Sequence, residues 1–129
     1  QGMVAGTHGS TFGGNPLAMA AANAVLDTII EDNIINNVDL MGKKLKGSLK
    51  KLASKHYTKI QEIRGTGLML GIKFKLNPDS LVEALLNRGL LVVAASDNVI
   101  RLLPPLVIND SHLKEAIEIF DATISQWGS

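Results

Sequence analysis

Apolar residues recur every three or four positions between Asn33 and Lys55, which is the spacing of one face of an α-helix. The apolar positions of this stretch are Ile34, Val38, Met41, Leu45, Leu49 and Leu52. Basic residues occupy the opposite side, at Lys43, Lys44, Lys46, Lys50 and Lys51. The pattern predicts a helix with a buried apolar face, and we interpret the lysines as its solvated face.

Three further stretches carry helix signals. Asn15 followed by Pro16 fits a helix start, and the Ala-rich sequence LAMAAANAVLDTII continues it. A short helix is expected to open at Asn77–Pro78 and to end near Arg88. The last helix is expected to begin after Asn109–Asp110. Its predicted apolar stripe consists of Leu113, Ile117, Phe120, Ile124 and Trp127.

Between Leu68 and Lys75 the period changes from 3.6 to 2, because apolar residues alternate with polar or small ones. This alternation predicts a strand with one buried face. Its expected partner is Tyr57–Arg64, with a tight turn at Gly65–Gly67 between the two strands. A second pair of short strands, joined by a turn, is expected at 90–94 and 98–103.

The order of these elements predicts the fold class. Helices come first, then a hairpin, a helix, a second hairpin and a last helix. Strands joined by short turns favour an antiparallel sheet, and helices with a single apolar side pack on one face of such a sheet. We therefore expect an α+β fold, a small antiparallel sheet with helices packed on one face.

The segment Gln1–Gly14 differs from the rest of the chain. It contains five of the twelve glycines and has neither helical nor strand periodicity, so it is predicted to be a loop. A long loop ahead of a domain suggests that the chain is part of a larger protein. We expect residues 1–14 to be a connection and residues 15–129 to form the domain with its leading helix.

Composition narrows the class of function. The 129 residues include 13 basic and 12 acidic side chains, for a formal charge of +1, so no strong field attracts nucleic acid or an anionic membrane. The lack of cysteine excludes disulfides, thiolate nucleophiles and cysteine-based zinc sites, and no metal site is expected. No stretch is long and apolar enough to span a bilayer. We expect a soluble, cytoplasmic protein without a nucleic-acid or membrane partner.

The segment GTHGSTFGGNPLA, from Gly6 to Ala18, is the first candidate for chemistry. It combines a flexible backbone with the hydroxyls of Ser10 and Thr11 just before a helix start, and each of these features suits an oxyanion. It matches neither a Walker loop nor a dinucleotide fingerprint, so a plain glycine-rich turn into a helix is the alternative. We interpret His8 as a residue that fixes the loop through a backbone contact.

Arg101 is the second candidate. It lies inside the apolar strand sequence VIRLL, where a guanidinium is costly unless it meets an anion. A structural carboxylate as its partner is the alternative to a bound ligand. Arg64, which precedes the glycine turn, is interpreted as structural or solvated and left out of the site.

Four segments together resemble the class III aminotransferases, which are fold-type I enzymes that depend on pyridoxal phosphate. HGSTFGGNPLA (His8–Ala18) resembles the signature loop of the family, and EIRGTGLMLGI (Glu62–Ile72) resembles the hairpin of its small domain. VIRLLPPLVI (Val99–Ile108) resembles the C-terminal strand, and GLLVVAASDN precedes it in the same order. Within the family, the acetylornithine type is the most similar.

The resemblance implies a role for each candidate. The chain would be the C-terminal small domain, with residues 1–14 as a phosphate-binding loop that leads from the large domain. Thr11 would bind the phosphate of pyridoxal phosphate held by the other subunit of a homodimer, with Ser10 beside it. Arg101 would bind a carboxylate of the amino-acid or oxo-acid substrate. The Schiff-base lysine and the acidic residue at the pyridine nitrogen would lie in the large domain, so the chain contains no catalytic residue and is expected to be inactive alone.

The implied reaction transfers an amino group from N-acetylornithine to 2-oxoglutarate, a step of arginine biosynthesis. Ornithine or 4-aminobutyrate as the amino donor is one alternative. A noncatalytic α+β association module, which uses the same hairpins only for packing, is another.

Overall fold

The computed structural model describes Val4, Gly6 and residues 9–128, which belong to two compact units, residues 1–34 and 35–129. The first unit contains the glycine-rich segment and one helix, and the second contains the sheet with its helices. Within the described part of the chain, no helix is both long and apolar enough to cross a membrane.

The first unit contains α1 (Pro16–Glu31), which starts where the sequence predicts it. Asn15 is the N-cap, and its side-chain oxygen accepts a hydrogen bond from the Ala18 backbone N–H at 3.0 Å. Pro16 takes the first helical position, which suits a residue without an N–H. No residue of α1 is buried, and apolar side chains such as Ile30 are exposed.

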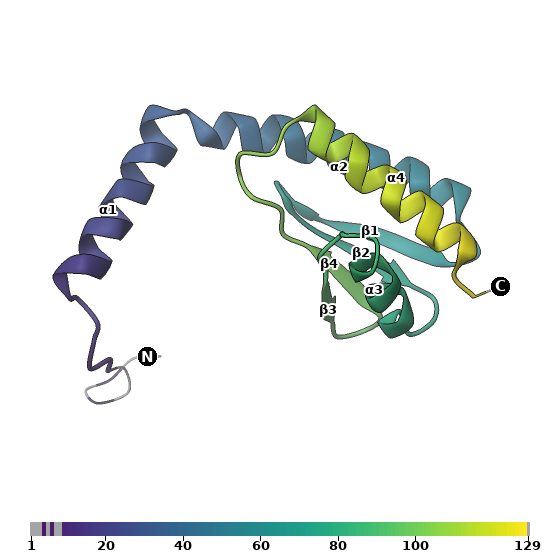
Figure 1. The fold of residues 1–129 in the computed structure, drawn as a ribbon, viewed down its shortest axis with the longest axis horizontal. Helices are drawn as coiled ribbons and strands as arrows, with labels where there is room; N and C mark the ends of the chain where they lie inside the picture. Colours follow the sequence, from purple (N-terminus) through teal and green to yellow (C-terminus); the bar gives the residue numbers. More distant parts are fainter. Residues whose placement is uncertain (1–3, 5, 7–8, 129) are drawn as a thin grey trace. The chain divides into compact units, whose positions relative to one another are not determined.

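The second unit is a four-stranded antiparallel sheet with helices packed on one face, as Figure 1 shows. The strand order is β1-β2-β4-β3, so two hairpins meet where β2 pairs with β4. The predicted α+β class is confirmed. In chain order the elements are α2 (Ile34–Lys55), β1 (Ile60–Thr66), β2 (Met69–Phe74), α3 (Asp79–Leu86), β3 (Val93–Ala95), β4 (Val99–Leu102) and α4 (Asp110–Gln126).

Two ion pairs fix α2 beside α4. The Lys44 Nζ lies 2.7 Å from an Asp110 carboxylate oxygen, and the Lys55 Nζ lies 2.6 Å from an Asp121 carboxylate oxygen. The two contacts are eleven residues apart on both helices (44 to 55 and 110 to 121), so α2 and α4 run parallel. Lys44, one of the lysines predicted to be solvated, therefore pairs with α4.

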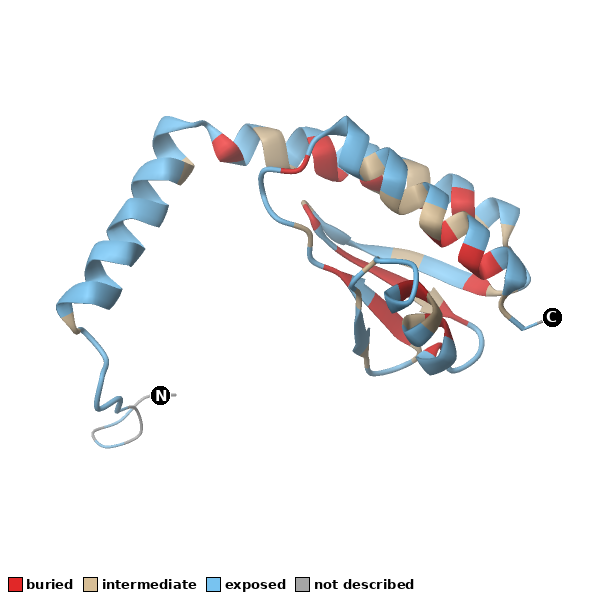
Figure 2. Cartoon of the chain, viewed as in Figure 1, coloured by how far each residue is buried: buried red, intermediate tan, exposed pale blue. Residues whose placement is uncertain are grey.

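One hydrophobic core joins the sheet to α2, α3 and α4. Figure 2 shows the buried positions on the strands of the sheet and on the helices that pack against it. The predicted apolar face of α2 is buried or packed against the core, and so is the predicted stripe of α4. The most deeply buried side chains are Leu49, Leu70, Ile72, Phe74, Leu81, Leu85, Ile100, Phe120 and Ile124.

The first hairpin differs from the sequence prediction in its register. Gly65 and Thr66 are not in the turn but remain in β1, and Thr66 pairs with Met69, so the turn is Gly67–Leu68. Gly65 has a φ of +120°, and a Cβ there would lie only 2.2 Å from the Met69 carbonyl oxygen. In the sequence, a glycine with this conformation inside a strand cannot be told from a turn glycine, because both need the same conformational freedom.

The second hairpin has its turn where the sequence predicts it. β3 and β4 are shorter than expected, and residues 96–98 join them. Asp97 and Asn98 have φ values of +65° and +55°, a region that Asn and Asp tolerate better than other residues with side chains. The Asn98 carbonyl oxygen accepts a hydrogen bond from the Phe74 backbone N–H at 2.9 Å, which ties this turn to the end of β2.

Candidate functional site

Ser10 and Thr11 lie in a hydrogen-bonded turn directly before α1. The Gly13 backbone N–H donates to the Ser10 carbonyl oxygen at 3.2 Å, and the Asn15 side-chain amide donates to the Phe12 carbonyl oxygen at 2.6 Å. These bonds link the turn to the cap of the helix. Both candidate side chains are exposed at the N-terminal end of α1. The third residue of this segment considered from the sequence, His8, lies outside the described residues.

The donors of this turn have the chemistry of a partial phosphate site. The Ser10 and Thr11 hydroxyls make no side-chain hydrogen bond within the described part of the chain. Gly14 adopts a φ of +74°, which turns the backbone into α1, and the first turn of that helix carries no acidic residue. A phosphate dianion needs several convergent donors. The residues present fit a phosphate group as one wall of a site.

Arg101 occupies the middle of β4 on the face of the sheet away from the core. Its neighbours Ile100 and Leu102 are buried on the opposite face, whereas Arg101 itself is exposed. The expected cost of burying this guanidinium therefore does not arise within the chain. The reason is that adjacent strand residues point to opposite faces. Among the described residues, none forms a hydrogen bond or an ion pair with the guanidinium of Arg101.

Arg64 lies on the same outer face, in the same row across the strands. The register pairs Arg64 with Gly71, and Gly71 with Arg101, so a single glycine separates the two arginines. Arg64 lies inside β1 and not at the end of the hairpin. A turn at Gly65–Gly67, as the sequence predicts, would put Arg64 at the end of the hairpin, which is why it is absent from the predicted site.

The outer face of the sheet carries a further cation, Lys73, which forms an ion pair. The Lys73 Nζ lies 2.6 Å from an Asp97 carboxylate oxygen. The hydrogen bond and the charge of Lys73, and then the charge of Arg64, hold the pKa of Asp97 below its ordinary value. Asp97 therefore remains charged at neutral pH and occupies the lysine. Neither arginine has such a partner among the described residues.

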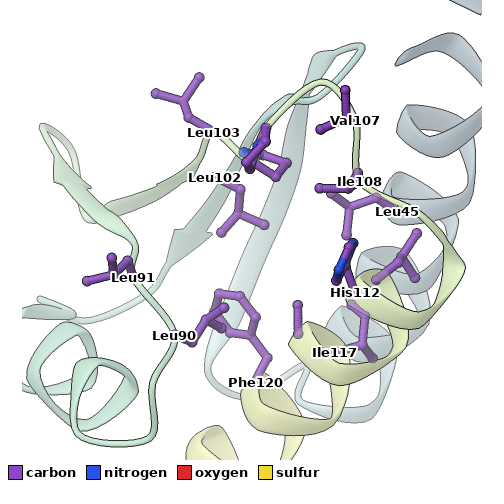
Figure 3. Close-up of a pocket in the computed structure, with 14 residues that line it drawn as sticks. Leu45, Leu90, Leu91, Leu102, Leu103, Val107, Ile108, His112, Ile117 and Phe120 are labelled. Carbon is purple, nitrogen blue, oxygen red and sulfur yellow. The ribbon is translucent and has the colours of Figure 1, made fainter. Parts of the chain in front are cut away.

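A pocket of about 490 Å³ opens between β4, the loop that follows it and α4, and no pattern in the sequence predicts it. Figure 3 shows its lining, which is almost entirely apolar, with Leu102 and Phe120 on its walls. His112 also lines it, but its Nδ1 accepts the Asn109 backbone N–H at 3.3 Å as part of the α4 cap. Because Leu102 and Arg101 point to opposite faces of β4, the pocket does not contain the candidate arginine.

Comparisons with known proteins find similarity to one enzyme family along nearly the whole chain. The sequence model described as aminotransferase class-III matches residues 1–124. Acetylornithine aminotransferase of Mesorhizobium japonicum is 48% identical over 116 residues, which are 90% of this chain and 29% of that protein. The crystal structure of acetylornithine aminotransferase from Elizabethkingia anophelis covers 97% of this chain and 34% of its own, with a TM-score of 0.84 and 37% identity.

An ornithine enzyme is similar to a comparable degree. Ornithine delta-aminotransferase of Plasmodium falciparum covers 97% of this chain and 32% of its own chain, with a TM-score of 0.85 and 34% identity. The chain thus spans about a third of the length of the relatives that it matches.

Proposed function

Because the chain belongs to the class-III aminotransferases, we propose that its parent protein transfers an amino group from N-acetylornithine to 2-oxoglutarate. The observation that carries this choice of donor is the 48% identity to an acetylornithine aminotransferase over 90% of the chain. The family uses pyridoxal phosphate, which when bound holds the amino group between the two half-reactions. Ornithine as the donor is the second candidate, because an ornithine enzyme has the same fold over the same span.

Thr11, in this proposal, donates a hydrogen bond to the cofactor phosphate held mainly by the other subunit of a cytoplasmic homodimer. Ser10 supplies a neighbouring hydroxyl. The exposure of both side chains supports this role, since a loop that completes a partner's site must present its donors outward. The lack of acidic residues in the first turn of α1 also favours an anion there.

Arg101 binds a substrate carboxylate in the same proposal. An exposed guanidinium without a protein partner among the described residues is available for a ligand, and its planar fork matches a carboxylate in two parallel hydrogen bonds. The bond orients the substrate, so that its reacting end and not its carboxylate meets the cofactor.

In this proposal the chain supplies binding groups, and the lysine that bonds covalently to the cofactor belongs to the large domain of the parent protein. Two of the lysines of the chain are engaged in other contacts. The Lys59 Nζ donates to the carbonyl oxygens of Ile124 and Trp127 at the end of α4, and the Lys46 Nζ donates to the Gly65 carbonyl oxygen at 2.8 Å. We expect the 129-residue chain neither to hold pyridoxal phosphate tightly nor to transaminate. A lysine-linked absorption band after mixing the chain with the cofactor would refute this.

The donor is tested with the purified parent enzyme. Glutamate formation from 2-oxoglutarate is followed with N-acetylornithine, ornithine and 4-aminobutyrate in turn. N-acetylornithine is expected to give the highest kcat/KM, and a clear preference for another donor would overturn the choice of substrate while leaving the family intact.

The roles of Thr11 and Arg101 are tested by substitution in the same enzyme. Thr11→Ala removes one hydrogen bond to a charged group and is expected to raise the Kd for pyridoxal phosphate roughly tenfold or more. Thr11→Ser retains a hydroxyl and serves as the control. Arg101→Gln is expected to raise KM for the substrates, with Arg101→Lys intermediate. If Thr11→Ala and Arg101→Gln both leave activity unchanged, the noncatalytic association module is the better account.

A further inference from the structure

Asn15 makes side-chain hydrogen bonds to both sides of its own position in the chain. Its amide oxygen accepts from the Ala18 backbone N–H at 3.0 Å, inside α1, and its amide nitrogen donates to the Phe12 carbonyl oxygen at 2.6 Å, in the turn before the helix. Only the first of these bonds belongs to an N-cap, whose side chain accepts from the N–H groups of the first helical turn. The second bond ties the helix to the turn that carries Ser10 and Thr11.

The backbone is held on both sides of Thr11. The Phe12 carbonyl oxygen also accepts the Asn15 backbone N–H at 3.4 Å, and the Gly13 backbone N–H donates to the Ser10 carbonyl oxygen at 3.2 Å. Thr11 therefore lies between two residues whose carbonyl groups are both hydrogen-bonded. Because each residue has only two soft backbone dihedrals and its side chain only a few rotamers, these bonds limit the directions in which the Thr11 hydroxyl can point.

The inside of this turn is closely packed. A Cβ built on Gly13 would lie 3.0 Å from the Ser10 Cβ and 3.3 Å from the Ser10 Oγ, whereas Gly14 has no described atom within 4 Å of its Cβ position. Among the described residues, the hydrogen bonds that join the turn to α1 all come from Asn15. The orientation of the turn on the helix therefore depends on this one side chain and its backbone N–H.

We propose that Asn15 is a positioning residue for the cofactor phosphate and that it acts through Thr11. The inference rests on the proposed function, in which the Thr11 hydroxyl donates to that phosphate. By holding the Phe12 carbonyl, Asn15 keeps the hydroxyl in its binding orientation before the cofactor arrives, so less conformational freedom is lost on binding. An asparagine side chain suits this role, because it carries an acceptor for the cap and a donor for the turn without a charge.

The test uses the parent enzyme, freed of cofactor and then titrated with pyridoxal phosphate. Asn15→Ser keeps a neutral cap, because serine also accepts from the helix N–H groups, but its single short hydroxyl cannot hold the Phe12 carbonyl at the same time. Asn109→Ser is the matched control. Asn109 caps α4 by accepting from the backbone N–H groups of Ser111 and His112 at 3.0 and 3.2 Å, but among the described residues its amide donates to no carbonyl.

Asn15→Ser is expected to raise the Kd for pyridoxal phosphate about fivefold, and Asn109→Ser is expected to leave it unchanged. The Kd for pyridoxal, which lacks the phosphate, should not change in either variant, whereas a merely structural role of Asn15 would raise both Kd values. In a double-mutant cycle, Asn15→Ser should add little to the effect of Thr11→Ala, because both changes act on the same contact.

The outcomes separate this inference from the proposed function. An unchanged Kd for pyridoxal phosphate in Asn15→Ser, an equal rise for pyridoxal, an equal rise in Asn109→Ser, or full additivity with Thr11→Ala overturns the positioning role and leaves the role of Thr11 intact. An unchanged Kd in Thr11→Ala overturns the proposed phosphate contact, and the role of Asn15 with it. If Asn15→Ser does not fold, the same measurements on Asn15→Thr, which also provides a neutral cap, decide the question.

Discussion

Alanine substitutions at two glycines of α2 can test how this helix packs against the first hairpin. Gly42 lies against the hairpin turn, and a Cβ built on it would be 2.5 Å from the Gly67 carbonyl oxygen and 2.7 Å from the carbonyl carbon. Gly47, on the same helix, has no atom within 4 Å of its corresponding Cβ position. Alanine at both positions therefore makes the same chemical change in two different surroundings.

The expected free energies follow from these distances. Replacing glycine by alanine inside a helix stabilises it by about 1 kcal/mol, so Gly47→Ala should raise the free energy of unfolding by about that amount. At Gly42 the same gain is opposed by a backbone contact 0.9 Å shorter than the 3.4 Å at which ordinary contact begins. Overpacking of this kind costs about 1–3 kcal/mol. Gly42→Ala should therefore be less stable than Gly47→Ala by about 1–3 kcal/mol.

Thermal unfolding of the 129-residue chain measures this difference. For a unit of this size, 1 kcal/mol shifts Tm by about 4–8 °C, so the two alanine variants should differ by several degrees. Gly47→Ala should unfold above the wild type. Equal Tm values for the two variants would mean that α2 does not approach the hairpin turn as the structure has it.

Two further predictions concern the stability of the second unit. The carboxylate of Asp121 accepts hydrogen bonds from Lys55 at 2.6 Å and His56 at 2.7 Å, and these partners, Lys55 first, lower its pKa. Because the folded pKa lies below the ordinary value near 3.9, this stabilisation is present above about pH 4 and is lost as the pH falls further. The Tm difference between wild type and Asp121→Asn should thus be larger at pH 7 than at pH 3, and an equal difference at both would contradict the contact. Gly65→Ala should destabilise the chain by about 3 kcal/mol, because it combines a positive φ with a backbone clash at Met69, and an unchanged denaturant midpoint would refute this.

Periodicity alone predicts most of the fold. The apolar positions of α2 recur over about five turns, and those of α4 over about four, so no other secondary structure buries them together. The caps mark the helix starts as well, since Asn15 and Asn109 accept the backbone N–H groups that the sequence signals predict. These features depend on residues close together in the chain, and they can therefore be inferred without knowledge of tertiary contacts.

The partners of the site residues depend on strand register, which the sequence leaves open. A turn made of Gly65–Gly67 would pair Arg64 with Leu68 and place the arginine on the core side. The observed turn at Gly67–Leu68 pairs Arg64 with Gly71 and turns it to the outer face. A small shift in the turn thus exchanges the faces of every residue in β1. The resemblance to the family identifies Arg101 as a candidate site residue. Nothing in the sequence shows that Arg64, two strands away, lies in the same row.

The glycines of the segment EIRGTGLMLGI each serve a separate contact of the same hairpin. Gly65 lets the end of β1 approach β2, and Gly67 forms the turn against Gly42 of α2. Gly71 leaves room for a methyl group of Val99, which would lie 3.1 Å from a Cβ there, and the stem of Arg64 lies beside it. A substitution at Gly42 would therefore act on Arg64 indirectly, by moving the hairpin backbone, whereas one at Gly71 would act by direct contact. Gly71→Val should therefore lower Tm less than Gly42→Val does, because only the substitution at Gly42 must displace backbone.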